Sequence, residues 1–448
     1  MATRSPDDRR NAGAALRRAL PRSTQGEWAP PADRADPVEI LIEQGKSRIQ
    51  ELLPIRYGRM RADPFAFLRG AAAVMAADLA HTPVTGIRMQ ACGDAHLANF
   101  GSYATPEGLP VFDINDFDET LPAPFEWDLK RLATSLVVSG RVAQYSEKAA
   151  RALAHSAARS YRVHMAALAR LSPVDAWNQH IDLARAIADI DQPKLRDAVE
   201  KRLARVIEST ARHFGLAEAK DGGVHIREEP PLIYHVDKHA LPARKAFASY
   251  AETLQEDRRV LLHRHALRDV AFKAVGVGSV GTFCAIALLT AGDGSPLLLQ
   301  IKEAQESVLA PFAGASDYAN HGERVVVGQR MMQAATDVFL GWTRTPIDNW
   351  HFYIRRLKDS RLANVGTRLQ AALPFYASLC GRTLARAHAR AGDPALVSGY
   401  AGTGNAFEEA ISAFAVAYAD QTEKDWNGFL AAIKAGRIDA GAPETRRS

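Results

Sequence analysis

Two groups of acidic and amide side chains, separated by one short turn, constrain the fold of this chain more than any other feature. The segment MQACGDAHLANFG (89–101) carries Asp94 and Asn99 and contains no Lys or Arg. The segment LPVFDINDFDE (109–119) carries four carboxylates, at Asp113, Asp116, Asp118 and Glu119. Carboxylates this close together repel one another unless a cation balances them. A compact fold must therefore bring a cation to both groups or leave them in solvent.

Both groups are predicted to lie at the ends of neighbouring strands. TGIRMQA (85–91) predicts one strand, and the second acidic segment predicts another after the turn signal TPEG (105–108). Antiparallel strands would place the two groups side by side. Asp and Asn oxygens without a soft ligand nearby are what Mg²⁺ prefers. We therefore predict a metal site here, while a solvated acidic turn that caps neighbouring helices stays open as an alternative.

Composition narrows the class of protein. The 448 residues are 47% hydrophobic and 24% charged, values typical of a globular chain with room for two or three domains. The net charge of +5 is mild, and without a basic run interleaved with aromatics it gives no indication of nucleic-acid binding. Three cysteines without a CxxC pattern exclude a disulfide framework and suit a reducing compartment. With no apolar run long enough to span a bilayer and no secretory signal, we expect a cytoplasmic protein without a membrane partner.

The order of helical and strand-like segments predicts four regions. Helical periodicity dominates most of the chain, and FEWDLKRLATSLVVSGRVA (125–143) is one amphipathic example. Near Asp269 the pattern changes to β-branched runs with a hairpin turn at AGDGSP (291–296), which predicts two or three antiparallel strands. The regions expected are a mobile tail at 1–34, a helical lobe with both acidic segments at 35–235, a small β-sheet lobe at 236–360, and C-terminal helices packing on the helical lobe at 361–448.

A glycine-rich stretch precedes one of the predicted strands. GVGSVG holds Gly276, Gly278 and Gly281, and the strand-like TFCAIALL (282–289) follows it. This order favours a β-hairpin whose glycines let backbone amides approach phosphates, rather than the start of a helix in a dinucleotide fold. A plain hairpin with bulge glycines fits the motif equally well.

A lysine further along supports the phosphate-binding interpretation. Lys302 ends the apolar strand LLLQIKEA and precedes a predicted helix that carries Glu323. A strand lysine held by a glutamate of a separate helix is typical of a phosphate clamp. Glu303 and Glu306 are alternative partners, but they lie too close to Lys302 in sequence to belong to a separate helix.

These residues resemble a known group of enzymes. CGDAHLANF followed by DFDE resembles the catalytic loop and metal-binding segment of aminoglycoside phosphotransferases and related kinase-like enzymes. The resemblance implies ATP and Mg²⁺ as cofactors, a catalytic role for Asp94, and metal binding by Asn99 and Asp116. Asp113 is the alternative to Asp116, and Asp128 matches the helix aspartate that braces the catalytic loop in such folds.

The pattern as a whole, including DPFAFLRGAA and WDLKRLATS, is similar to the bacterial domain-of-unknown-function 2252 family from about Asp36 to Ile433. That family name brings no substrate with it.

The sequence departs from the kinase pattern in three ways. Asp118 stands where the metal-binding triplet usually has glycine, and Cys92 replaces the basic region ahead of the catalytic aspartate. The Gly-rich stretch and Lys302 also follow the catalytic loop instead of preceding it, which a circular permutation would explain. We therefore expect an α+β, protein-kinase-like (aminoglycoside-phosphotransferase-like) two-lobed fold that is circularly permuted and largely helical.

The function expected from this pattern is an ATP- and Mg-dependent phosphotransferase acting on a hydroxyl of an unknown acceptor. Two alternatives remain open. One is a metal-dependent phosphoesterase built on Asp94, His96, Asp113 and Asp116. The other is a non-catalytic nucleotide-binding regulatory protein.

Overall fold

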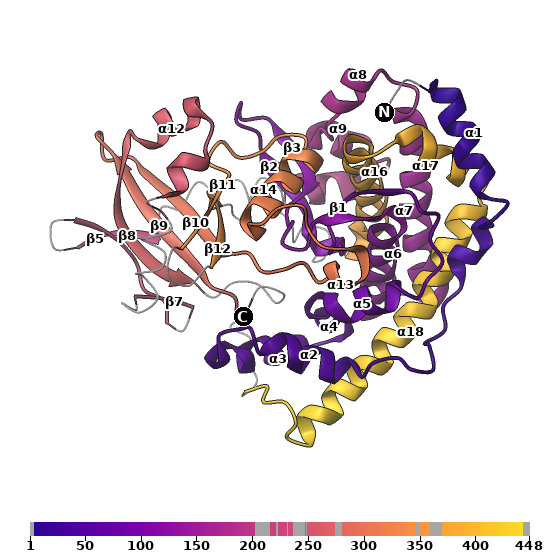
Figure 1. The fold of residues 1–448 in the computed structure, drawn as a ribbon, viewed down its shortest axis with the longest axis horizontal. Coiled ribbons are helices and arrows are strands. Elements are labelled where there is room, and N and C mark those ends of the chain that lie inside the picture. The colour runs from indigo at the N-terminus through magenta and orange to yellow at the C-terminus, as the bar shows by residue number, and fades with distance from the viewer. Residues whose placement is uncertain are drawn as a thin grey trace.

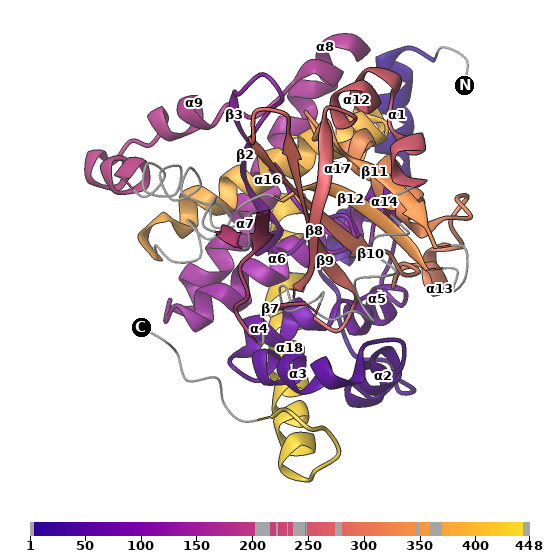
Figure 2. The same cartoon turned by 90° about the vertical axis from the view of Figure 1, so that its left-hand side faces the viewer.

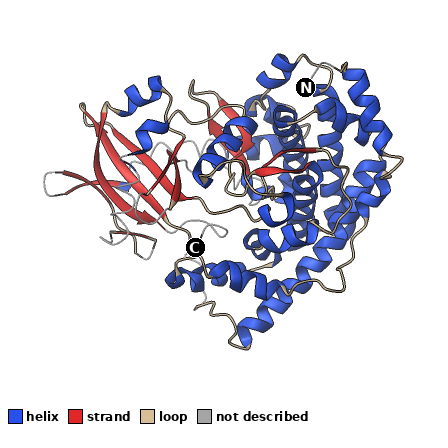
Figure 3. Cartoon of the chain, in the orientation of Figure 1, coloured by secondary structure: helices blue, strands red, loops and turns tan. Residues whose placement is uncertain are grey.

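The computed structural model is a mixed α+β structure, about 53% helical, with a small sheet at one side of a larger group of helices (Figures 1 and 3). It describes residues 4–201, 216–220, 223–230, 232–235, 247, 249–273, 280–345, 350–357 and 370–441. In these ranges we find no helix with the length and apolar character needed to cross a bilayer.

The N-terminal segment is not the mobile tail expected for residues 1–34. It forms α1 (Pro6–Leu16) and the 3₁₀ helix η1 (Arg22–Gly26). At Gly13 an added Cβ would lie 2.0 Å from the carbonyl oxygen of Leu396, so α1 packs directly against backbone near the end of the chain. The expectation was wrong because the buried residue of α1 is a glycine, Gly13, and the helix shows no strong apolar stripe in the sequence.

Short helices follow α1 and η1 and lead to the acidic segments. They are α2 (Pro37–Gly45), η2 (Gln50–Leu52), α3 (Leu53–Met60), α4 (Pro64–Gly70) and α5 (Ala72–Leu79). The sequence suggested one continuous helix over 64–80, but Ala71, with φ −110° and ψ 37°, separates α4 from α5. The break frees the carbonyl of Gly70, which accepts a hydrogen bond from the guanidinium of Arg56 at 2.7 Å.

The two acidic segments lie on two antiparallel pairs of strands. The elements are β1 (Arg88–Ala91), η3 (Leu97–Asn99), β2 (Phe100–Ala104), β3 (Pro110–Ile114) and β4 (Leu121–Pro124). β2 pairs antiparallel with β3, with Phe100 opposite Ile114, so the strands that flank the turn form the expected hairpin, but the strand predicted at 85–91 is not part of it. β1 pairs instead with β4, with Ala91 opposite Leu121. The loop after β1 and the loop after β3 therefore emerge next to each other.

Long helices form the main core. They are α6 (Phe125–Val142), α7 (Glu147–Leu168), α16 (Leu373–Ala391), α17 (Pro394–Ala401) and α18 (Ala406–Lys434), with the short α8 (Pro173–Asn178), α9 (Leu183–Ala188) and η7 (Gln370–Ala372) beside them. α6 is buried around almost its whole circumference because α7, α16 and α18 all contact it. The C-terminal helices thus pack on the helices that follow the acidic segments, and Phe125 and Trp127 are buried in this core.

A six-stranded antiparallel sheet faces the viewer in Figure 2, in the order β11-β12-β10-β9-β8-β7. Its strands are β7 (Ile233–Tyr234), β8 (His265–Lys273), β9 (Cys284–Ala291), β10 (Pro296–Glu303), β11 (Gly341–Arg344) and β12 (His351–Arg356). A separate hairpin joins β5 (Ala217–Lys220) to β6 (Gly223–Ile226). β8, β9 and β10 confirm the strands predicted from the sequence. Strands begin before residue 236, earlier than the expected start of the sheet lobe.

One helix joins the sheet to the helical core. α14 (His321–Met332) contacts β11 and β12 on one side and α16 and β1 on the other. The remaining short elements are η5 (Ala251–Thr253), α12 (Glu256–Leu262) and α13 (Ala310–Ala313). The sheet and the helices keep separate apolar cores, and the acidic loops lie where the two parts meet.

Candidate functional site

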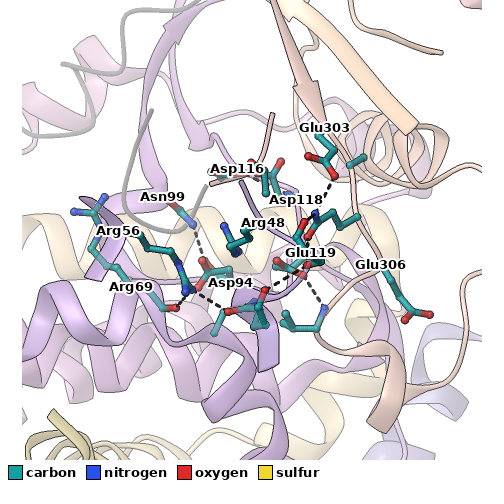
Figure 4. A pocket seen from close by; sticks show the side chains of 18 of the residues that line it. Arg48, Arg56, Arg69, Asp94, Asn99, Asp116, Asp118, Glu119, Glu303 and Glu306 are labelled. Atoms are coloured by element: carbon teal, nitrogen blue, oxygen red, sulfur yellow. Dashed lines mark hydrogen bonds between the residues drawn. The ribbon is translucent and has the colours of Figure 1, made fainter. Parts of the chain in front are cut away.

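A cavity of about 530 Å³ lies between the acidic loops, the first helices and the end of β10 (Figure 4). Asp94, Asn99 and Asp116, which the sequence singles out, all line it. The other charged residues of the lining are Arg48, Arg56, Arg69, Asp118, Glu119, Glu303 and Glu306. The cavity is therefore a strongly charged space formed by segments far apart in the chain.

Asp94 is held at the cavity by one of its two carboxylate oxygens. The Nε atom of the buried Arg131, on α6, donates to its Oδ1. The other oxygen, Oδ2, lies 3.7 Å from Nε2 of His96. Burial lowers the pKa of His96 to about 3, so this imidazole is neutral near pH 7. Among the described residues no side chain donates a hydrogen bond to Oδ2 of Asp94, so this oxygen can accept a proton from a bound hydroxyl.

Asp128 fixes the backbone of the loop that carries Asp94. Its Oδ2 accepts from the amide of Cys92 at 2.7 Å, and its Oδ1 accepts from the amide of Gly93 at 3.0 Å. Gly93 has a φ of +83°, and an added Cβ would lie 2.2 Å from the carbonyl oxygen of Glu119. Only glycine fits where the two acidic loops touch. Asp128 therefore braces this loop.

Asn99 and Asp116 are brought together by backbone contacts between the same two loops. The amide of Asn115 donates to the carbonyl of Asn99 at 2.8 Å. The side-chain Nδ2 of Asn99 donates to the carbonyl of Asp94 at 2.8 Å, which orients the amide and leaves Oδ1 available as a ligand. Burial, together with the charge of Asp118, raises the pKa of Asp116. A bound cation would relieve this cost.

The donors that Asn99 and Asp116 offer are oxygens, the ligand type that Mg²⁺ prefers. Among the residues described, no group of three or more His, Cys, Asp or Glu side chains is placed to hold a metal ion. Mg²⁺ is commonly held by one or two protein oxygens and completes its octahedron with water and substrate phosphate. Asn99 and Asp116 supply such a pair of oxygens at the cavity surface.

Asp113, the alternative metal ligand, is not at the cavity. It is 1% exposed and pairs with Arg386, itself fully buried. Its Oδ2 also accepts from the amide of Ala334 at 2.9 Å. Its carboxylate is therefore occupied by a structural cation and by backbone, because successive residues of a strand point to opposite sides and Asp113 points inward.

Lys302 lies beside the acidic loop, where it pairs with Asp118. Its Nζ lies 2.7 Å from Oδ2 of Asp118, and the hydroxyl of Tyr353 donates to Oδ1 of the same carboxylate. The ammonium is buried, and the charges of Asp116 and Asp118 outweigh desolvation and raise its pKa.

The expected pairing of Lys302 with Glu323 is wrong. Glu323 lies in the first turn of α14, where its amide donates to the capping Asn320, and its carboxylate has no partner among the described residues. Its neighbour Arg324 instead faces the acidic segment and donates to the carbonyl of Asp118 at 2.8 Å. Adjacent helical residues point about 100° apart, so only one of the two can face this segment.

The Gly-rich stretch connects β8 to β9. Gly276 and Gly278 lie outside the described residues. Gly281 has a φ of +93°, and its carbonyl accepts from the amide of Ile49 at 2.7 Å. The next residue, Thr282, lines the cavity, so the end of the stretch lies at the site.

Sequence reasoning missed most of the cations. Arg56 lies on α3, Arg69 lies on α4 and Arg48 lies in the connection between α2 and η2, all in segments without a recognisable motif. Arg131 could have been found, because it lies three residues after Asp128 and so on the same face of its helix. Asp118 was noted as one of the clustered carboxylates and as a departure from the kinase pattern, but not as the partner of Lys302 that it is.

A comparison with protein families gives one match. A family model described as "Uncharacterized protein conserved in bacteria (DUF2252)" matches residues 48–432. Searches of curated proteins and of solved structures returned no match.

Proposed function

Because this chain belongs to the DUF2252 family, whose description names no activity, we propose a function from the site itself: an ATP- and Mg-dependent phosphotransferase that acts on a hydroxyl group. One observation carries the proposal. Lys302, on the sheet, is bonded to Asp118, which lies in the same loop as Asp116, and this loop and the loop of Asp94 and Asn99 line one cavity. Phosphoryl transfer needs a cation for the phosphates and oxygen ligands for a metal at the same place.

Each residue has a distinct role in this proposal. Asp94 accepts the proton of the acceptor hydroxyl at Oδ2, while Arg131 keeps its carboxylate in position. Asn99 and Asp116 hold Mg²⁺, which neutralises phosphate charge. Lys302 binds the nucleotide phosphates, either by leaving Asp118 or while it remains paired with Asp118. Backbone amides near Gly281 cover the phosphate tail, together with Gly276 and Gly278.

The fold proposed from this arrangement is protein-kinase-like and circularly permuted. Three features support it: an antiparallel sheet with a buried lysine in an inner strand, a glycine-rich connection between two strands, and a helical part with the acidic loops. The sheet follows the acidic loops in the chain instead of preceding them.

The structure offers less support to a phosphoesterase. That interpretation needs Asp113 among the metal ligands, and Asp113 is buried against Arg386 instead. It would also leave Lys302 and the end of the Gly-rich stretch without a role.

Calorimetry tests the proposed function directly. A non-hydrolysable ATP analogue should bind the 448-residue chain with Mg²⁺ and bind much more weakly with EDTA. ATP should then be consumed in the presence of hydroxyl acceptors, with a phosphorylated product detected by mass spectrometry. Nucleotide binding without turnover for any acceptor would favour the regulatory protein. Phosphate release from monoesters without nucleotide binding would favour the phosphoesterase.

A further inference from the structure

The first helices place three arginines at the cavity, and the proposed nucleotide and metal sites do not account for all of them. Figure 4 shows Arg56 and Arg69 on one side of the cavity and Glu303 and Glu306 on the other. The cations come from the segments around α2, α3 and α4, whereas the carboxylates come from the acidic loops and the end of β10. The cavity therefore carries positive charge on one side and negative charge on the other.

Arg48 belongs to the sheet side of this cavity. Its Nη1 donates to the carbonyl of Val280 at 2.8 Å, and its Cβ lies 3.0 Å from where a Cβ on Gly281 would be. Burial lowers its pKa, and the nearby carboxylates of Glu119 and Glu303 partly offset that effect. Its charge is thus only partly offset by these carboxylates at the end of the Gly-rich stretch, next to the proposed phosphate tail.

Arg56 is a buried cation with only neutral acceptors. It is 1% exposed, and its Nη2 donates to Oε1 of Gln44 at 2.9 Å and to the carbonyl of Gly70 at 2.7 Å. Its Nε and Nη1 have no partner among the described residues. Burial lowers its pKa, and the charge of Arg48 lowers it further. A buried guanidinium without an opposing charge is costly, and an anion would relieve that cost.

Arg69 lines the same cavity as the proposed catalytic base, Asp94, and has no polar partner among the described residues. Its guanidinium lies over the ring of Phe65, 5.9 Å from the centroid, and its buried Nε is unsatisfied. Burial lowers its pKa, and the carboxylates of Asp94, Asp63 and Asp116 partly restore it. In Figure 4 Asp94 lies between Arg69 and Asp118, the partner of Lys302. Arg69 therefore approaches Asp94 from the side away from the proposed phosphate clamp.

We propose that the acceptor carries an anionic group, a phosphate or a carboxylate, which Arg69 and Arg56 bind while its hydroxyl faces Asp94. This inference rests on the proposed function. An arginine fork matches either anion with two parallel hydrogen bonds. In the transfer, the acceptor oxygen bonds to the γ-phosphorus and the bond to the ADP oxygen breaks with its electron pair on ADP. The hydroxyl proton moves to Asp94. The products are ADP and the phosphorylated acceptor.

Calorimetry with inorganic phosphate as the probe tests the anion site without any nucleotide. Wild-type protein should bind phosphate, and Arg69→Gln should weaken that binding about 10- to 100-fold, the loss of one charged hydrogen-bond donor. Arg69→Lys should restore part of the affinity because it keeps the charge. Arg10→Gln, at an arginine on the distant α1, is the matched control and should bind phosphate as the wild type does. Thermal unfolding of each variant checks that the fold is kept.

A saturating Mg²⁺ complex of a non-hydrolysable ATP analogue separates the acceptor site from the nucleotide site. Phosphate should still bind beside the analogue, and Arg69→Gln should lower the affinity for the analogue by less than about threefold, because the two sites differ. Displacement of phosphate by the analogue, with both affinities falling equally in Arg69→Gln, would assign Arg69 to the nucleotide and overturn the inference. Absence of phosphate binding at about 10 mM, roughly the weakest affinity that still has a use as a test, would also overturn it.

Acceptor pairs then test the substrate class. Glycerol 3-phosphate and glycerate should be phosphorylated with kcat/KM at least about tenfold above glycerol, and Arg69→Gln should abolish that preference. An equal rate with all three compounds would overturn the inference while leaving the proposed function intact. Phosphate binding through Arg69 without any nucleotide binding would have the opposite meaning: the anion site would stand and the phosphotransferase would fail.

Discussion

Lys302 and Asp118 form an ion pair, with Nζ 2.7 Å from Oδ2, although 184 residues separate them in the sequence. Tyr353 donates to the second oxygen of the same carboxylate. This pair joins the sheet to the acidic loops. The charges of Asp116 and Asp118 both raise the pKa of the buried Lys302 ammonium. The position of the proposed phosphate clamp therefore depends on a residue that stands where a glycine was expected.

Removing the Lys302 ammonium should destabilise the fold. Lys302→Met should lower the free energy of unfolding by about 3 kcal/mol, because breaking a buried pair leaves the carboxylate of Asp118 uncompensated. Urea unfolding measures the change. The double variant Lys302→Met with Asp118→Asn should lose less than the sum of the two single variants. Additive losses would show that the two side chains do not interact in solution.

Substitution of Asp116 should weaken nucleotide binding, whereas substitution of Asp113 should lower the stability of the fold. Asp116→Asn should weaken Mg-dependent nucleotide binding at least about tenfold and keep the fold, because its carboxylate lines the cavity and has a raised pKa. Asp113→Asn should instead destabilise the protein by about 3 kcal/mol, because Arg386 would be buried without a full charge opposite it. Calorimetry with and without Mg²⁺ and urea unfolding separate the two effects. Unchanged Mg-dependent affinity in Asp116→Asn would remove this residue from the metal site.

Substitution of Asp94 should slow the phosphoryl-transfer step and leave nucleotide binding unchanged. Asp94→Asn keeps an oxygen for Arg131 but cannot accept a proton, so turnover should fall by about 10²- to 10⁴-fold. Asp293→Asn, in the exposed turn between β9 and β10, is the matched control and should keep full turnover. Circular dichroism confirms that the loop change has not altered the fold. A wild-type rate in Asp94→Asn would exclude Asp94 as the base.

Stability should depend on pH through Glu119. Burial raises the pKa of this carboxyl from 4.5 to about 7. Between these two values the folded state keeps a proton that the unfolded state has lost, so this group makes stability fall as pH rises through that window. Above pH 7 both states are ionised and the cost becomes constant. The difference in unfolding free energy between wild type and Glu119→Gln, measured without metal at pH 4.5, 6 and 8, should show this fall. A difference that does not change with pH would contradict the raised pKa.

The sequence by itself determined the local parts of this protein. The turn signals and alternation around AGDGSP gave the hairpin of β9 and β10, and the helical period gave α6 and the C-terminal helices. The sequence also predicted that the two acidic segments lie side by side, and Asp94, Asn99 and Asp116, which the resemblance to kinase-like enzymes singled out, line one cavity. Gly93, at their contact, is fixed by its positive φ and by the carbonyl of Glu119.

Only the tertiary structure decided which charges face one another. The sequence offered Lys302 several glutamates and left Asp113 and Asp116 as alternatives, since residue type and spacing do not say which side of an element is buried. Packing of α14 turned Arg324 toward the acidic loop instead of Glu323. The arginines at 48, 56 and 69 became part of the site only when the first helices closed against it. Periodicity and turn chemistry act over a few residues, whereas ion pairs and cavity linings depend on contacts across the whole chain, and no local pattern encodes them.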